Sequence, residues 1–259
     1  MKHKGLLIVG IVSLVLGLSL CSIAYQRRGD MLFSYTNFGK VSVDENPFQG
    51  KEYTYEPKEN IDTLVLDVAM AHIEIERGNA FKLETENMPE MNQKSKEIHL
   101  NSSVHGKEYK IEQTSDNHFT FQNLNVSMKI VVPSSIRAIR IETAMGDVQI
   151  RKVDLQDLDV TCQLGNVEVN ESTIANGSLD LSMGDLEFDG QVKEFLKANN
   201  AMGNIDLALQ GGREEYTIDA DTDMGEVDVD HGHDHDAKDE GLARIEAYTN
   251  MGNVDIAFK

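Results

Sequence analysis

Imidazole and carboxylate side chains crowd together in one stretch near the C-terminus, HGHDHDAKDEG. Side chains of these two types at such short spacing suit Zn²⁺, Ni²⁺ or Cu²⁺. The sequence therefore predicts a metal site made of His231, His233, Asp234, His235 and Asp236. The alternative is a solvated polar insertion, because surface loops accept extra length at little cost in free energy.

A second set of carboxylates recurs at a fixed place in a repeated phrase. The phrase occurs six times, as AMGDVQI, QLGNVEV, SMGDLEF, AMGNIDL, DMGEVDV and NMGNVDI. Three residues after its glycine stand five acids, which we call the acidic column: Glu168, Glu187, Asp206, Asp228 and Asp255. Like charges on neighbouring strands repel, so we expect weakly bound divalent cations or a basic partner on this column. The alternative is a solubilising face whose side chains spread apart.

Enzymatic chemistry finds little support in the sequence. Serine, histidine and aspartate are present, but no nucleophile motif of the G-x-S-x-G kind occurs. Polysaccharide cleavage would require a groove lined with aromatic residues, and the chain has no tryptophan. We therefore expect no catalytic residue, no tightly bound cofactor and no enzyme. A carbohydrate-active enzyme is the weaker alternative.

The repeated phrase also predicts the fold. Its glycines follow one another at spacings of 19, 19, 19, 22 and 27 residues, which indicates a solenoid: Gly146, Gly165, Gly184, Gly203, Gly225 and Gly252. The residues two and four after each glycine are apolar and the residue between them is polar. This alternation is typical of a β-strand with one buried face, and a second strand precedes the glycine. We predict an all-β, single-stranded β-helix or solenoid with about 19–20 residues per turn.

Stacking of the turns makes further predictions about single positions. The glycines should turn the chain with positive φ, and the methionine before each glycine should pack into the core. A carboxylate, Asp or Glu, alternates with Asn directly after the glycines, which reduces repulsion and lets these side chains bind the turn backbone. Cys162 falls at an inward position as a small buried residue. The segment TLVLDVAMAHIEIE, with Ala71 in place of glycine, is predicted to form the first turn, and the last copy is predicted to leave an open edge.

The N-terminus predicts a membrane anchor. Residues 5–25 carry no charge and are long enough, as a helix, to cross a hydrocarbon core of about 30 Å. The basic residues Lys2 and Lys4 favour a cytoplasmic N-terminus and an extracytoplasmic C-terminal domain. Cleavage after Ala24 and lipidation of Cys21 are the alternatives. The expected domains are a membrane anchor at 1–28, a stalk and N-terminal cap at 29–60, and the solenoid at 61–259.

Net charge excludes one class of partner. The chain has 44 acidic against 24 basic residues, for a formal net charge of -20. Nucleic-acid binding depends on Lys and Arg that neutralise phosphates, so we expect no nucleic-acid partner. Cations or basic proteins fit this charge better.

The anchor, the irregular segment ending in VVPSSI and the copies that begin with IRIETAMGDVQI resemble the bacterial putative adhesin family of β-solenoid proteins. The resemblance covers about residues 60–259. Some members of that family, the LiaG type among them, are membrane-anchored proteins encoded with cell-envelope stress systems. The resemblance implies a binding or scaffolding role in the bacterial cell envelope. The open edge predicted at the last copy would take an envelope protein or a second copy as partner. A domain that binds or senses divalent cations or transition metals is the alternative.

Overall fold

The computed structural model describes residues 50–56, 61–93, 98–115, 126–230 and 243–259. Within these ranges the chain is almost entirely β-strand, with one short 3₁₀ helix, η1, at Arg213–Glu215. None of the helical structure in these ranges is long and apolar enough to cross a membrane. The predicted anchor at 5–25 lies outside the described residues, as does much of the predicted stalk and cap at 29–60.

Each copy of the phrase forms one coil of a β-solenoid, named here by its corner residue. A leading segment ends one to three residues before the corner, and a trailing segment begins one or two residues after it. The coils of Ala71 and Gly146 use β2 (Thr63–Met70) with β3 (His72–Arg77) and β8 (Ala138–Met145) with β9 (Val148–Arg151). The next three use β10 (Asp154–Cys162), β11 (Val167–Leu181), β12 (Leu186–Met202) and β13 (Ile205–Leu209). The last two use β14 (Tyr216–Met224) with β15 (Val227–Val229) and β16 (Ala243–Met251) with β17 (Val254–Phe258).

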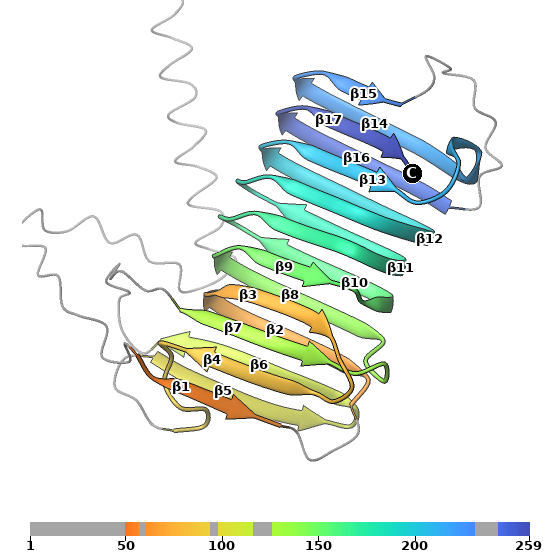
Figure 1. Ribbon diagram of the computed structural model, residues 1–259. Helices are drawn as coiled ribbons and strands as arrows, with labels where there is room; N and C mark the ends of the chain where they lie inside the picture. Colours follow the sequence, from red (N-terminus) through yellow and green to blue (C-terminus); the bar gives the residue numbers. More distant parts are fainter. Residues whose placement is uncertain (1–49, 57–60, 94–97, 116–125, 231–242) are drawn as a thin grey trace, which may run out of the picture. The chain divides into compact units, whose positions relative to one another are not determined.

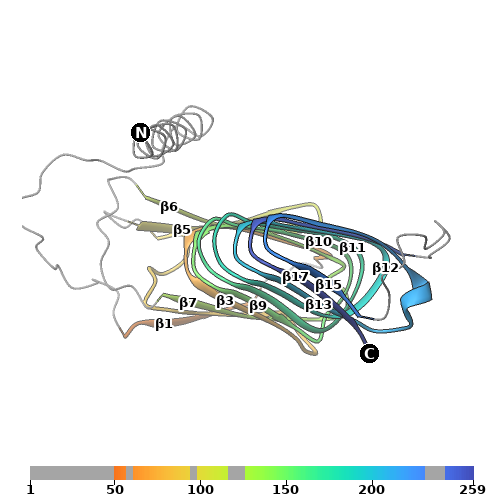
Figure 2. The ribbon, with the colours of Figure 1, turned by 90° about the horizontal axis from the view of Figure 1, so that it is seen from above.

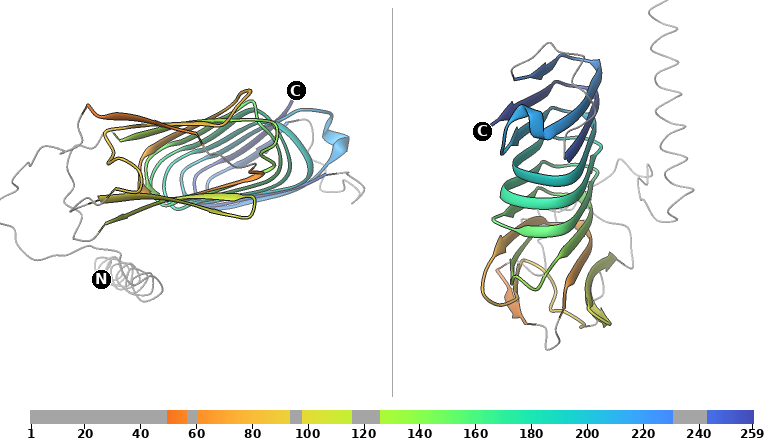
Figure 3. Two further views of the ribbon diagram at one scale, coloured as in Figure 1. Left: turned by 90° about the horizontal axis from the view of Figure 1, so that it is seen from below. Right: turned by 90° about the vertical axis from the view of Figure 1, so that its right-hand side faces the viewer.

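The coils stack through parallel pairing in an order that differs from the chain order. From Ala71 the order is Gly146, Gly165, Gly184, Gly203, Gly252 and then Gly225. Figure 1 shows β15 beyond β17, and the right-hand view of Figure 3 shows one more coil of the stack above the coil that holds the C-terminus. The prediction that the last copy ends the stack is therefore wrong, because β17 pairs on both sides, with β13 and β15.

The prediction that Ala71 begins the stack is also wrong. Its coil lies between the Gly146 coil and a further layer made of β6 (Glu108–Ser115) and β7 (Ser127–Val132). Antiparallel strands complete this end: β5 (Ile98–His105) pairs with β6, β4 (Lys82–Glu86) with β7, and β1 (Glu52–Tyr55) with β4. The segments between Ala71 and Gly146 thus form strands, and two of them, β4 and β5, run against the solenoid.

The coils lie one over another when the molecule is viewed along the stack (Figure 2). Their buried apolar side chains form a single core that runs through the stack. The residues two after the corner are completely buried in six coils: Ile73, Val148, Val167, Leu186, Ile205 and Val254. Side chains alternate along a strand, so the polar residue three after each corner points outward. The buried columns were predicted from the sequence.

The corner glycines are required by close contact between coils. Gly184 has φ of 136°, and a Cβ built on it would overlap the carbonyl oxygen of Gly165. The same overlap with the coil before it in the stack recurs at each corner glycine. Positive φ, as predicted, is found at five of the six glycines; Gly225 is the exception.

Three residues before several corners stand inward polar side chains, here called the polar column, that bind glycine carbonyl groups. The Nδ2 atom of Asn200 donates to the Gly184 oxygen at 2.7 Å, and the hydroxyl of Thr249 donates to the Gly203 oxygen at 3.1 Å. Thr222 does the same for Gly252 at 2.9 Å. These bonds explain polar residues at inward positions, since a buried polar group without a partner is costly.

Candidate functional site

The trailing segments carry a ladder of hydrogen bonds directly after the corners. An oxygen of Asp147 accepts from the backbone N–H of Asn166 at 2.8 Å, and Asn166 accepts from Asp185 at 2.9 Å. Three further bonds continue the ladder through Asn204, Asn253 and Glu226 at 2.8–3.1 Å. The predicted binding of the turn backbone is confirmed, with each side chain reaching the next coil. In the observed order two amides, Asn204 and Asn253, lie next to each other.

The acidic column is continuous in the structure. Its residues pair in register in the order Glu168, Glu187, Asp206, Asp255 and Asp228. Burial and then the carboxylates of Asp255, Asp185 and Glu187 raise the pKa of Asp206. Parallel strands lie about 4.8 Å apart, so the carboxylates in this row repel one another.

The surface around the acidic column is acidic as well. It is formed by the outward side chains of the trailing segments from Glu168 onward, and we call it the acidic face. Asp185, Asp189, Glu226 and Asp230 flank the column on either side. Two cations contact this face: Lys259 forms an ion pair with Asp189 at 2.8 Å, and Lys152 lies 3.6 Å from Glu171. Such an excess of negative charge favours basic ligands and cations over nucleic acid or anionic lipid.

The residues before the corners form an exposed apolar line, the methionine ridge: Met70, Met145, Leu164, Met183, Met202, Met251 and Met224. Exposed fractions reach 41% at Leu164, 43% at Met183, 41% at Met251 and 62% at Met224. The prediction that these residues pack into the core is wrong for the four exposed ones, whereas Met145 and Met202 are half-buried and Met70 packs against the core. They share the parity of the inward positions, but the positive φ of the following glycines marks a corner where that alternation ends. Flexible thioethers at a surface suit binding to another molecule.

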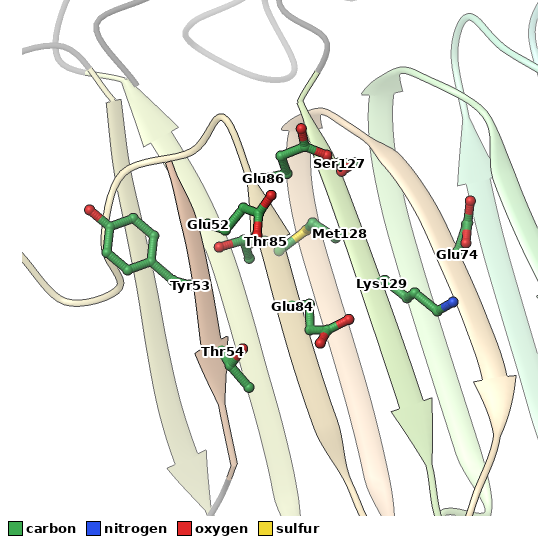
Figure 4. Close-up of a pocket in the computed structure, with 10 residues that line it drawn as sticks. All are labelled: Glu52, Tyr53, Thr54, Glu74, Glu84, Thr85, Glu86, Ser127, Met128 and Lys129. Carbon is green, nitrogen blue, oxygen red and sulfur yellow. Dashed lines mark hydrogen bonds between the residues drawn. The ribbon is translucent and has the colours of Figure 1, made fainter. Parts of the chain in front are cut away.

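A shallow depression of about 360 Å³ lies at the other end of the trailing side (Figure 4). Its lining comes from β1, β4, β7 and β3, and it includes Glu52, Glu74, Glu84 and Glu86 with one cation, Lys129. The Ser127 hydroxyl lies 3.5 Å from Glu86 as a hydrogen-bond donor. The depression is thus also acidic, and no pattern in the sequence predicts it. The depression forms because β4 pairs antiparallel with β1 and β7, and the repeat pattern in the sequence does not predict this pairing.

The predicted metal site at His231, His233, Asp234, His235 and Asp236 lies outside the described residues and stays a prediction. Among the residues that the structure describes, no group of three or more His, Cys, Asp or Glu side chains converges as a metal site would require. The acidic column is a row along the stack, consistent with diffuse attraction of cations.

Cys162 is fully buried in its coil, as predicted. Burial raises the pKa of its thiol to about 11. Its Sγ lies 3.6 Å from the Gly146 oxygen, in the polar column beneath the corners. A buried thiol with a raised pKa holds little thiolate at neutral pH, which makes it a poor nucleophile.

Comparison with known families agrees with this architecture. The family Toastrack DUF4097 matches residues 61–192 and 92–257, and the chain belongs to this family. No curated protein matches it.

Several solved structures resemble the chain at low sequence identity. A putative cell adhesion protein from Clostridium sporogenes is 14% identical, with 82% of this chain and 100% of that chain covered and a TM-score of 0.49. A putative adhesin from Parabacteroides merdae is 9% identical over 83% and 97%, with a TM-score of 0.40. A putative lipid binding protein from Parabacteroides distasonis is 16% identical over 81% and 97%, with a TM-score of 0.33.

Proposed function

We propose that this protein is a non-enzymatic binding or scaffolding domain of the bacterial cell envelope. The observation that carries the proposal is the acidic face, where five carboxylates stand in register on five successive coils. The methionine ridge borders this face at the corners and adds an apolar contact line. A surface with both features suits a partner that presents basic and apolar side chains together.

The family resemblance adds the setting. In this proposal residues 5–25 anchor the protein in the cytoplasmic membrane as a single pass, and the solenoid at 61–259 stands outside it on the segment 29–60. The role is tied to envelope stress, as in the LiaG-type members that the sequence resembles. Protease treatment of intact cells tests the orientation: the solenoid should be accessible, and protection would contradict it.

Crosslinking of the full-length protein in intact cells tests the binding role. We expect a specific envelope protein to be recovered with the wild type and to be reduced by the triple variant E187Q, D206N and D255N on the acidic face. The matched control neutralises Asp154, Asp157 and Asp159 on the leading segment of the Gly165 coil and should leave recovery unchanged. Equal recovery with both variants would rule out the acidic face as the binding surface.

The alternative is a divalent-cation or transition-metal binding surface that uses the histidine-rich stretch and the acidic column. The raised pKa of Asp206 favours it, because a nearby cation would relieve the same repulsion. Calorimetric titration of Zn²⁺ into the wild type and a variant lacking 231–236 tests the histidines. Equal uptake by both proteins would exclude them as ligands.

A further inference from the structure

We propose that the free edge of the Gly225 coil, formed by β14 and β15, takes an extended segment of another protein as an added strand. The segment would alternate basic and apolar residues. This inference rests on the proposed binding function and specifies where the partner binds and what chemistry it presents. Three observations carry it: the backbone at the edge, the exposed end of the core and the charge around it.

The backbone of the edge is available for pairing. Among the described strands, β14 pairs only with β16 and β15 only with β17. The backbone oxygen of Glu226 accepts from the backbone N–H of Val254 at 3.0 Å, and the backbone N–H of Asp230 donates to the backbone oxygen of Ile256 at 2.8 Å. Residues of a strand alternate in the neighbour that they bind, so Val227 and Val229 direct their backbone groups to the free edge. Such an edge is a template for strand addition.

The apolar core is open at this end. Val227 is 40% exposed, whereas Val148 and Val254, which hold the same position in other coils, are completely buried. Ile218 and Val229 are only partly buried, although their counterparts Ile245 and Ile256 are buried. An added strand with apolar residues on its inner side would continue the core by one layer, as each coil does for its neighbour.

The outward residues of the edge coil determine the charge of the partner. Asp221, Asp223, Asp228 and Asp230 form no ion pair with any residue that the structure describes. Asp219 differs, because Arg244 lies 3.8 Å from it and its hydrogen bond raises the pKa of Tyr248 to about 12. Side chains on an added strand would stand about 5 Å from these carboxylates, where Lys or Arg is favoured and Asp or Glu is not.

This charge also argues against two other occupants. A second copy joined edge to edge would set the carboxylates of β14 and β15 against those of its counterpart. The segment 231–242 of the chain itself carries Asp234, Asp236, Asp239 and Glu240 against a single Lys238. Both are more acidic than basic, so a basic segment from a different protein fits the edge best.

A labelled ten-residue peptide of alternating lysine and valine is the probe, and fluorescence anisotropy on the full-length protein in nonionic detergent is the measurement. We expect saturable binding that weakens with salt, and no binding of the matched glutamate and valine peptide. The variant V229P removes an edge N–H without touching the pairing with β17, and it should weaken binding at least tenfold while the melting temperature stays close to the wild type. A second variant, D221N with D223N and D228N, should also weaken binding and reduce its salt dependence.

The control neutralises three carboxylates on the leading segment of the Gly165 coil, as D154N, D157N and D159N, and should change affinity less than twofold. If the acidic-face variant E187Q, D206N and D255N abolishes binding of the peptide and V229P does not weaken it, the peptide binds the acidic face and not the edge, and the inference is overturned while the proposed function stands. Binding that appears only after 231–242 is replaced by a Gly/Ser linker of equal length would assign the edge to the chain's own segment and overturn the inference. A dimer of the wild type in analytical sedimentation that becomes a monomer in V229P would also overturn the inference. Failure of the wild type to recover any partner from intact cells would instead contradict the proposed function.

Discussion

Replacement of Gly184 by alanine tests how closely the coils approach. The residue has φ of 136°, a conformation that costs an L-residue about 1–3 kcal/mol. The added Cβ would also overlap the carbonyl oxygen of Gly165, and overpacking of this kind costs a further 1–3 kcal/mol or so. We therefore expect G184A to lower the free energy of unfolding by about 4 kcal/mol.

The assay is urea unfolding of the full-length protein in nonionic detergent, followed by circular dichroism. Gly106, in the turn between β5 and β6, is the matched control because its φ is 66° but a Cβ there would meet nothing within 4 Å. G106A should cost only about 1–2 kcal/mol, from backbone conformation alone. Equal losses for G184A and G106A would refute the close packing of the Gly165 and Gly184 corners.

Three further predictions concern the polar column, the acidic column and the methionine ridge. T249V removes the donor to the Gly203 oxygen and should cost about 1 kcal/mol in the same unfolding assay. T85V removes a buried hydroxyl that finds no hydrogen-bond partner within the described part of the chain, and it should be neutral or stabilising. Because the folded state raises the pKa of Asp206, protonation of this residue stabilises the fold at acid pH, and that contribution is lost as pH rises through the raised pKa. D206N should therefore raise the melting temperature at pH 7, and this gain should vanish near pH 3. Millimolar Ca²⁺ should stabilise the wild type more than D206N. The control is D157N, because Asp157 pairs with Asn176 and Ala138 and has no carboxylate beside it in register. Mild peroxide followed by mass spectrometry should oxidise Met183, Met224 and Met251 before the buried Met88 and Met128, and uniform oxidation would contradict the exposed ridge.

Much of the fold could be predicted from the sequence because each coil repeats the same local rule. Apolar residues two and four after the glycine predicted the buried columns, and Asp185 and Asn204 showed their hydrogen-bonding role through position alone. The position of the methionines was predicted wrongly because the alternation of Met183 with Leu181 and Leu179 ends at the corner. A period-2 rule assumes a continuous strand.

The stack order could not be predicted, because the in-register columns of all copies are interchangeable. Nothing in NMGNVDI itself indicates contact with AMGNIDL rather than with DMGEVDV. The one signal is the longer spacing of 22 and 27 residues, since a chain that steps over a neighbouring coil needs extra length. Gly211, Gly212 and η1 occupy that extra length between β13 and β14. The acidic column is continuous in either order, because every copy from the Gly165 coil onward carries an acid at this position.

Disulfide trapping tests the central claim, that the last coil of the chain is inserted between the Gly203 and Gly225 coils. Cysteines are placed at 206 with 255, or at 206 with 228, after C21S and C162S. Asp206 pairs in register with Asp255, so the first pair lies within the range of a disulfide, while Asp228 lies one strand further away. We expect the first pair to crosslink readily under mild oxidation and the second not to; the reverse result would restore the chain order and contradict the stacked arrangement described above.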